Sequence, residues 1–200
     1  FLVSILPSAH IPRILHNASS YGKNGRIRAR HTASNNAKRI DTPMDNTMNS
    51  AIYIELPQLG EYAASAAKLL SPESEGSGRT EARRLQKCCR EMRRSHAEIA
   101  RRYGTVTSPP AACEWLLDNW YMIEREYRGV LPQIEGARRL RLCPDGVLAA
   151  ALCRNMLMSG RGEVTEERFR AYMEGFQSVT VLRRGELCLI PALLGAAVIE

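Results

Sequence analysis

The segment from residue 109 to residue 128, PPAACEWLLDNWYMIEREYR, has apolar residues around most of the circumference of the helix that it predicts. At about 100° per residue, Leu116, Trp120 and Ile123 project within about 60° of arc, whereas Trp115 points about 140° away from Trp120. A helix with so wide an apolar surface is usually packed by neighbours on two or three sides. We therefore expect this helix at the centre of the core, with both tryptophans serving packing.

The rest of the chain from Leu56 onward reads as further helices separated by short turns, without a strand pattern. Ser108 is the expected cap of the helix over residues 109–128, and GVLPQIEG after it is an expected loop. The sequence thus predicts an all-α, bundle-like domain of about six helices over residues 56–200. The other expected helices cover residues 58–70, 80–103 and 144–159, a stretch after Thr165, and a stretch from about 184 to the end that is interrupted near Pro191.

Residues 1–55 differ from this pattern. The first fifty residues hold seven Lys or Arg and two Asp or Glu, and they lack apolar periodicity. We expect a disordered or poorly ordered basic tail. The chain starts without methionine and stops without a helix cap, which predicts a fragment whose helical domain is truncated at its C-terminus. No uncharged run reaches the roughly 18–20 residues of a membrane span, so no transmembrane segment is expected.

The residue types that carry chemistry are not arranged as a site. None of the six cysteines belongs to a C-x-x-C pair, and the four histidines form no H-x₃₋₅-H pair, so a metal site is not expected. Reduced core thiols in a cytosolic protein are the expected state. There is no nucleophile–base pair, no paired acids and no Gly-rich phosphate loop. We therefore predict no catalytic, cofactor-binding or metal-binding residue in this chain.

The expected helix over residues 80–103 has a strongly basic side opposite Leu85. Residues 79–102 contain nine Lys or Arg but only three Glu. Such a row can be a solvated face, a contact with an anionic membrane surface, or a docking surface for an acidic domain. Nucleic-acid binding is less favoured, because no base-reading groups accompany the cations. The row, here called the basic stripe, consists of Arg83, Lys87, Arg90, Arg94 and Arg101.

Two polar residues lie on apolar helix faces. Asn119 projects at the edge of the apolar arc, where a buried amide needs several hydrogen-bond partners. It is either a tie to the backbone of a neighbouring loop or a ligand contact. His96 lies about 20° from Leu85, and is either a hydrogen-bonded core residue or a pH-sensitive or ligand-binding group.

Three motifs occur in one order over about 145 residues. They are A-C-E-W-L-L-D-N-W-Y-M-I-E at 112–124, Y-M-E-G-F-Q-S-V-T at 172–180 and G-E-L-C-L-I-P-A-L-L at 185–194. In these motifs the chain resembles the N-terminal region of the cyclic β-1,2-glucan synthase family, large bacterial enzymes with a glycosyltransferase domain and a glycoside-phosphorylase-like C-terminal domain. It departs from the family at Cys188, where the family has tryptophan, and residues 1–50 resemble nothing in it.

The resemblance implies a helical accessory region that is itself non-catalytic. The parent enzyme would be a membrane-bound glycosyltransferase that uses UDP-glucose and a divalent metal, both bound by a transferase domain further along the polypeptide. That domain would be the main partner, and the expected location is the cytoplasmic side of the inner membrane. The alternative is a free-standing basic helical module that binds an anionic partner, which would be a lipid surface, an acidic protein or a nucleic acid.

Overall fold

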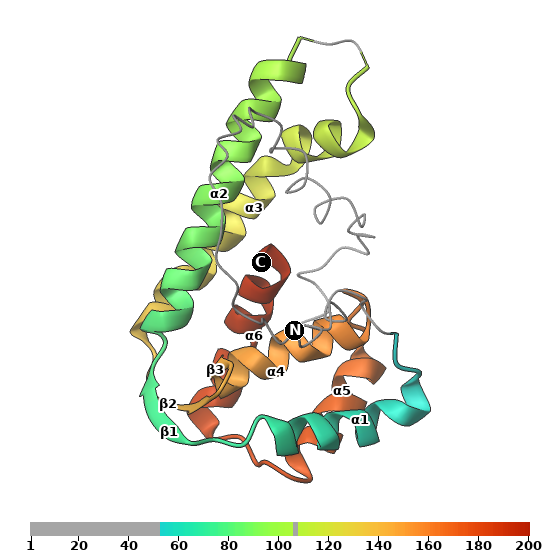
Figure 1. Cartoon of the computed structure of the whole chain (residues 1–200), viewed down its shortest axis with the longest axis vertical. Coiled ribbons are helices and arrows are strands. Elements are labelled where there is room, and N and C mark those ends of the chain that lie inside the picture. Colours follow the sequence, from blue (N-terminus) through green and yellow to red (C-terminus); the bar gives the residue numbers. More distant parts are fainter. Residues whose placement is uncertain (1–52, 106–107) are drawn as a thin grey trace, which may run out of the picture. The chain divides into compact units, whose positions relative to one another are not determined.

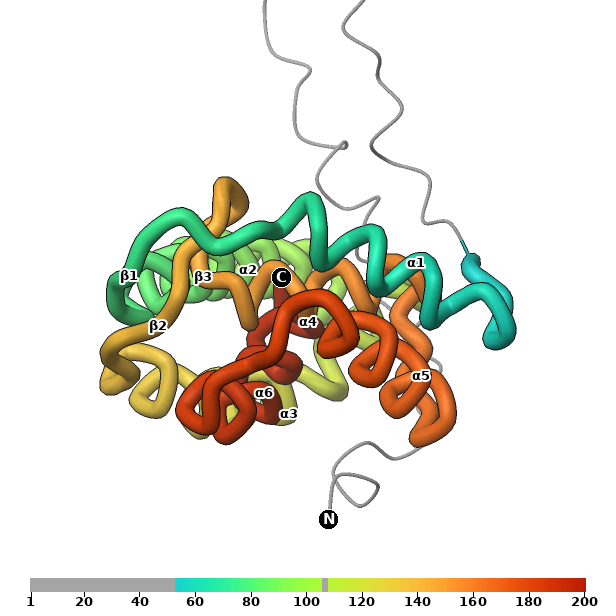
Figure 2. Tube along the Cα trace, turned by 90° about the horizontal axis from the view of Figure 1, so that it is seen from below, coloured from blue at the N-terminus to red at the C-terminus, as the bar shows by residue number. Residues whose placement is uncertain are grey.

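The computed structural model describes residues 53–105 and 108–200, all of which belong to one compact unit. Its described part contains six helices and three short strands (Figures 1 and 2). The prediction of a disordered basic tail over residues 1–55 falls, apart from residues 53–55, outside the described residues. None of the described helices combines the length and apolar character needed to cross a membrane.

The helices confirm the predicted all-α class with about six helices. In chain order they are α1 (Leu56–Leu69), α2 (Arg79–Tyr103), α3 (Ala111–Gly136), α4 (Leu148–Ser159), α5 (Glu166–Gln177) and α6 (Arg184–Ile199). Thr165 caps α5 as expected, because its side chain accepts a hydrogen bond from the backbone N–H of Arg168.

A small antiparallel sheet corrects the expectation that the domain has no strands. Its order is β1 (Ser74–Ser77), β2 (Arg138–Cys143), β3 (Gly146–Val147), with Ser74 opposite Leu142 and Leu142 opposite Val147. The sequence predicts only a turn at residues 74–77, between the helices expected over 58–70 and 80–103, and it predicts that residues 146–147 lie within a helix. The strands are very short, and β1 pairs with a segment more than sixty residues away, so local periodicity does not reveal them.

Helix α3 begins later and ends later than predicted. It starts at Ala111, after Pro110 rather than Ser108, and continues through Pro132 to Gly136 instead of stopping near residue 128. Pro132 removes one backbone donor, which normally ends or bends a helix. Here Val130 and Ile134, on either side of it, are buried, and their packing holds the last turns in helical form.

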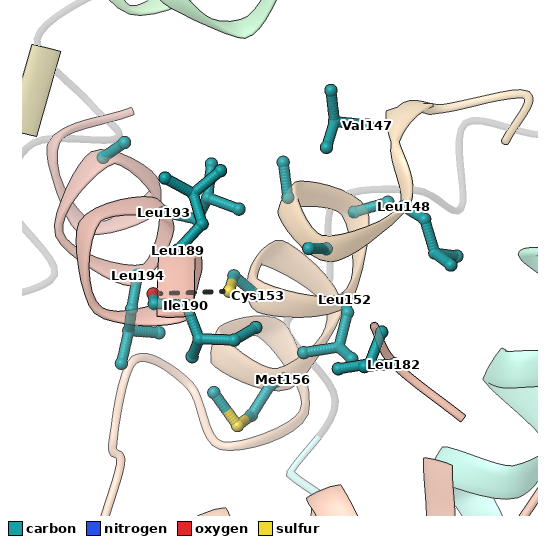
Figure 3. Close-up of a cluster of buried hydrophobic side chains, with 14 of the residues drawn as sticks. Val147, Leu148, Leu152, Cys153, Met156, Leu182, Leu189, Ile190, Leu193 and Leu194 are labelled. Atoms are coloured by element: carbon teal, nitrogen blue, oxygen red, sulfur yellow. Dashed lines mark hydrogen bonds between the residues drawn. The ribbon is translucent and has the colours of Figure 1, made fainter. Parts of the chain in front are cut away.

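The centre of the core is formed by α4 rather than by the tryptophan-bearing helix. Leu148, Leu152, Cys153 and Met156 of α4 are all buried (Figure 3). The Cys153 thiol points toward α6 and lies 3.9 Å from the carbonyl oxygen of Ile190, whereas Leu148 and Leu152 project from the other side of α4. On the other side, α5 supplies buried Tyr172 and Phe176. Helix α1 packs against α5, as the cartoon and the tube show (Figures 1 and 2).

The prediction that Trp115 and Trp120 are central core residues is wrong, since both are only half-buried. The buried residues of α3 are Leu116, Val130 and Ile134. In Figure 1 the halves of α2 and α3 nearest their connection lie side by side beyond the other described helices. In that part of α3 the wide apolar arc therefore packs against α2 alone among the described helices, instead of against neighbours on two or three sides as predicted. Periodicity reports how apolar a helix is, but not which of its turns have neighbours.

Candidate functional site: the basic face of α2 and its hairpin with α3

Helix α2 is held on two sides by α3 and α6. Toward α3, Arg93 donates to Glu124 through Nε at 2.6 Å and Nη2 at 3.1 Å. Toward α6, Arg84 forms an ion pair with Glu200 at 3.0 Å, and the Cys88 thiol donates to the carbonyl of Ile199 at 3.6 Å. These contacts set the rotation of α2, and with it the direction of every cation along the helix.

The basic stripe lies on the side of α2 away from both neighbours, and all five of its residues are exposed. Arg101 is paired with Glu98 at 2.8 Å. Within residues 53–105 and 108–200, no carboxylate oxygen lies within 4.0 Å of the four others, which are Arg83, Lys87, Arg90 and Arg94. The structure thus places the predicted residues on one exposed side of α2. Four of the five, in successive turns from Arg83 to Arg94, have no acidic partner in the described part, and Arg101 follows two turns later.

The remaining arginines in the body of α2 behave differently. Arg84 and Arg93 are paired across helix contacts, and Arg102 is paired with Glu98. The Arg101 and Arg102 guanidinium groups lower the pKa of Glu98 to about 2 through hydrogen bonds. Apart from Arg79 at its first residue, the helix therefore has paired arginines at 84, 93, 101 and 102 and an unpaired row of four cations at 83, 87, 90 and 94. Positive surface charge that no neighbouring acid neutralises can attract an anionic partner across a distance of about one Debye length.

An open groove on the hairpin combines aromatic and charged side chains. Hydrogen bonding from Arg93 lowers the pKa of Glu124, one of its lining residues, against the opposing effect of burial. The Arg93 guanidinium also lies 5.1 Å from the centre of the Tyr127 ring, a cation–π geometry. Most of the charged side chains that line the groove are therefore bonded to one another. The groove is lined by Arg93, Trp120, Tyr121, Glu124, Arg125 and Arg128.

His96 and Asn119 both serve the hairpin. The His96 ring is half-buried and stacks on Trp120, with ring centres 4.6 Å apart and planes 19° apart. It is therefore a packing contact between α2 and α3. Asn119 is half-buried, and its Nδ2 donates to the carbonyl of Trp115 at 2.8 Å. The amide is thus tied to its own helix rather than to a neighbouring loop, which corrects the predicted tie.

The most completely bonded polar residue is Glu186, which sequence reasoning did not single out. It is 1 % exposed. Its Oε1 accepts from the backbone N–H and the Nε of Arg141, and its Oε2 accepts from Arg141 Nη2 at 2.5 Å and from the backbone N–H of Arg183 at 2.8 Å. Burial alone would raise the pKa of this carboxyl, but the hydrogen bonds outweigh it and lower the pKa. Glu186 thus joins β2 to the start of α6.

Glu81 makes a second buried tie, from α2 to the start of α4. It is 5 % exposed, accepts from the backbone N–H of Val147 at 3.1 Å, and pairs with Arg154 at 2.8 Å. A signal was present in the sequence, because Glu81 falls about 40° from Leu85 on the apolar side of α2. An acid in that position indicates a buried partner. The partner, Arg154, lies on a different helix and could not be identified from spacing.

The cysteines are all free, but they are not all core thiols. Cys89, Cys143 and Cys153 are buried, Cys88 and Cys113 are half-buried, and Cys188 is exposed. Desolvation raises the pKa of Cys153 to about 12. Among residues 53–105 and 108–200, no group of three or more His, Cys, Asp or Glu side chains has a geometry that could hold a metal ion.

No protein-family model, curated protein or solved structure matches this chain. The resemblance to the cyclic β-1,2-glucan synthase family stays a prediction from the three motifs. The structure places those motifs on α3, on α5 with the turn that follows it, and on residues 185–194 of α6.

Proposed function

We propose that this chain is a helical scaffold region of a glycosyltransferase that resembles the cyclic β-1,2-glucan synthases, and that it is itself non-catalytic. The observation that carries the proposal is the position of Glu186. This acid belongs to the G-E-L motif, and it is used completely for joining β2 to α6. A carboxylate held by five hydrogen bonds in a buried place supports a fold and is not available to a substrate.

Other residues of the motifs support the same conclusion. Tyr172 and Phe176 of the second motif are both fully buried, and Thr180 donates to the carbonyl of Ala67 at 3.4 Å. Leu189, Ile190 and Leu193 of the third motif pack against α4. The residues by which the chain resembles the family are thus largely residues that build this fold. A resemblance of that kind supports a shared domain structure more than a shared reaction.

In this proposal the partner is the transferase domain of the same polypeptide, on the cytoplasmic side of the inner membrane. UDP-glucose and the divalent metal would be bound by that domain. The described residues offer no metal-binding cluster, and no catalytic role is assigned to any of them.

The direct test is the reading frame beyond residue 200. A transferase domain with a D-x-D motif and membrane spans is expected there. Deleting residues 53–200 from that longer protein should abolish or strongly reduce glucan formation from UDP-glucose by membranes that contain it. A stop codon directly after the chain, or full glucan synthesis by the deletion variant, would overturn the proposal.

A second test concerns the non-catalytic part of the proposal. The purified chain, supplied with UDP-glucose and Mg²⁺ or Mn²⁺, should release no UDP above a blank without protein. Turnover that a single substitution in this chain abolishes would show that the region is an enzyme.

The free-standing basic module is the second candidate. The observation in its favour is the row of four cations without an acidic partner in the described part, which a purely internal scaffold does not need. The same reading-frame test separates the two, because a complete short gene favours the module.

A further inference from the structure

We propose that the exposed row of α2 formed by Arg83, Lys87, Arg90 and Arg94 is a docking surface for a bilayer containing anionic lipid. The proposal stands whether the domain is free or joined to an enzyme, so its failure would leave the scaffold function untouched. It rests on three properties of the row: the side of α2 on which it lies, the lack of acidic partners for its charges in the described residues, and its narrow shape.

The direction of the row is set by the packing of α2. With Leu85 at zero on a helical wheel, Cys89, Arg93 and His96 face α3 between about 20° and 80°. Arg84 and Cys88 face the end of α6 between about 260° and 300°. The four cations lie between about 140° and 200°, in the middle of the remaining arc. Both neighbouring helices therefore pack on the far side of α2 from the row.

No acid among the described residues neutralises the charge of the row. The first fifty residues of the chain are themselves positively charged and do not supply the missing negative charge. The four side chains have no carboxylate within ion-pair distance in residues 53–105 and 108–200. The first fifty residues carry seven Lys or Arg against two Asp or Glu, and so bear the same sign. An external anionic partner complements the row better than any segment of this chain.

The narrowness of the row favours a flat partner. From Arg83 to Arg94 it extends about 16 Å along the helix axis, at about 1.5 Å per residue, and is only about 60° wide. Glu91 and Glu98 border it on one side, at about 240° and 220°. A plane touches a cylinder along one line and avoids these acids. A nucleic-acid groove or a concave protein surface would wrap further round and meet them, at a cost in like-charge repulsion.

The chemistry of the row also fits phosphate headgroups. Three of the four residues are arginines, whose planar guanidinium groups can donate two parallel hydrogen bonds to a phosphate. Lys or Arg at an anionic membrane surface strengthens binding by about fivefold per residue, and the effect falls as salt shortens the Debye length. Four such residues predict a change on the order of several hundredfold.

The experiment compares two quadruple variants of the full chain in vesicle binding. The test variant carries Arg83→Gln, Lys87→Gln, Arg90→Gln and Arg94→Gln. The control carries Lys68→Gln, Arg125→Gln, Arg139→Gln and Arg184→Gln, four exposed cations elsewhere that also lack an ion pair in the described part. Both lose the same charge, and glutamine is a good helix former. Circular dichroism should show the same helical spectrum for all three proteins.

The unchanged chain should bind vesicles of phosphatidylcholine with phosphatidylserine, release them as salt rises, and ignore pure phosphatidylcholine vesicles. The test variant should lose at least about 100-fold in affinity, and the control less than about fivefold. Millimolar inorganic phosphate should not displace the vesicles. The double variant Arg83→Gln with Arg90→Gln should lose an intermediate amount, which keeps the test valid if the quadruple variant folds poorly.

Three results would overturn the proposal. The first is no binding of the unchanged chain to anionic vesicles at low salt. The second is an equal loss in test and control variants, which would mean that total charge alone drives binding. The third is tighter binding to RNA or DNA than to the vesicles at the same salt concentration, which would assign the row to nucleic acid.

Discussion

Gly175 of α5 and Gly60 of α1 approach so closely that a Cβ atom added to Gly175 would lie 2.2 Å from the Gly60 carbonyl oxygen. The reverse is not true, because a Cβ atom on Gly60 would meet its nearest atom, the carbonyl oxygen of Ala171, at an ordinary 3.8 Å. The close crossing of the two helices therefore depends on one of the two glycines. Backbone lies on both sides of the contact, so a rotamer change cannot relieve it.

We predict that Gly175→Ala lowers the free energy of unfolding by about 1–3 kcal/mol, the usual cost of overpacking. Gly60→Ala should be tolerated. Gly129→Ala is a matched control, because Gly129 lies in α3 with nothing within 4 Å of the added Cβ atom. It should stabilise the chain by about 0.5–1 kcal/mol through helix propensity. Urea unfolding of the three variants measures this, and equal effects of Gly175→Ala and Gly60→Ala would contradict it.

Breaking the buried pair between Glu186 and Arg141 should be costly. The two side chains are 1 % and 14 % exposed, and Glu186→Gln leaves Arg141 without its counter-charge. We expect a loss of about 3–5 kcal/mol. Glu166→Gln is the control, since its pair with Arg170 is 64 % and 66 % exposed and should contribute less than about 1 kcal/mol. A loss below about 1 kcal/mol for Glu186→Gln in chemical denaturation would show that the tie is not structural.

The same pair predicts a pH dependence of known sign. Hydrogen bonding makes the folded-state pKa of Glu186 lower than its unfolded value, despite burial. Its contribution to stability is then fully present above the ordinary carboxyl pKa of about 4.3, and is lost as the pH falls through the lower folded value. The difference in unfolding free energy between the unchanged chain and Glu186→Gln should therefore be constant from pH 7 to 5 and shrink below about pH 4. A constant difference down to pH 3 would exclude this.

The aromatic residues should rank by their observed burial. Phe176 is fully buried, so Phe176→Ala should cost about 3–5 kcal/mol. Trp115 and Trp120 are half-buried on the hairpin, and alanine at either position should cost about 1–2 kcal/mol, within the ordinary range for partly buried sites. Thermal melts followed by circular dichroism give the ranking. If alanine at Trp115 or Trp120 lowers the free energy of unfolding more than Phe176→Ala does, α3 rather than α4 would form the centre of the core.

Thiol labelling should distinguish the cysteines in the folded chain. Exposed Cys188 should react with a disulfide reagent within minutes at pH 8, and Cys188→Ser should remove that fast phase. Cys153 should react only on unfolding, because burial both excludes the reagent and raises the pKa of its thiol to about 12. Mass spectrometry of the labelled peptides checks both. Rapid labelling of Cys153 under native conditions would mean that α4 opens locally.

Several features of the molecule were readable from local sequence. Apolar spacing predicted six helices close to where they lie, and the hydroxyl of Thr165 marked the start of α5. The basic stripe was equally predictable, because residues three and four apart on a helix share a face whatever the helix packs against. Its exposure followed from its position opposite Leu85.

The sequence by itself therefore determined the helical class, the faces of the helices and the basic row on α2, since all of these depend on contacts within a few residues. Only the tertiary structure decided which helix occupies the centre. It placed α4 there and left Trp115 and Trp120 half-buried, because burial depends on neighbours from distant parts of the chain. The pairing of β1 with β2, and the partners Arg141 of Glu186 and Arg154 of Glu81, were decided in the same way. These contacts join segments more than forty residues apart, and no local periodicity encodes them.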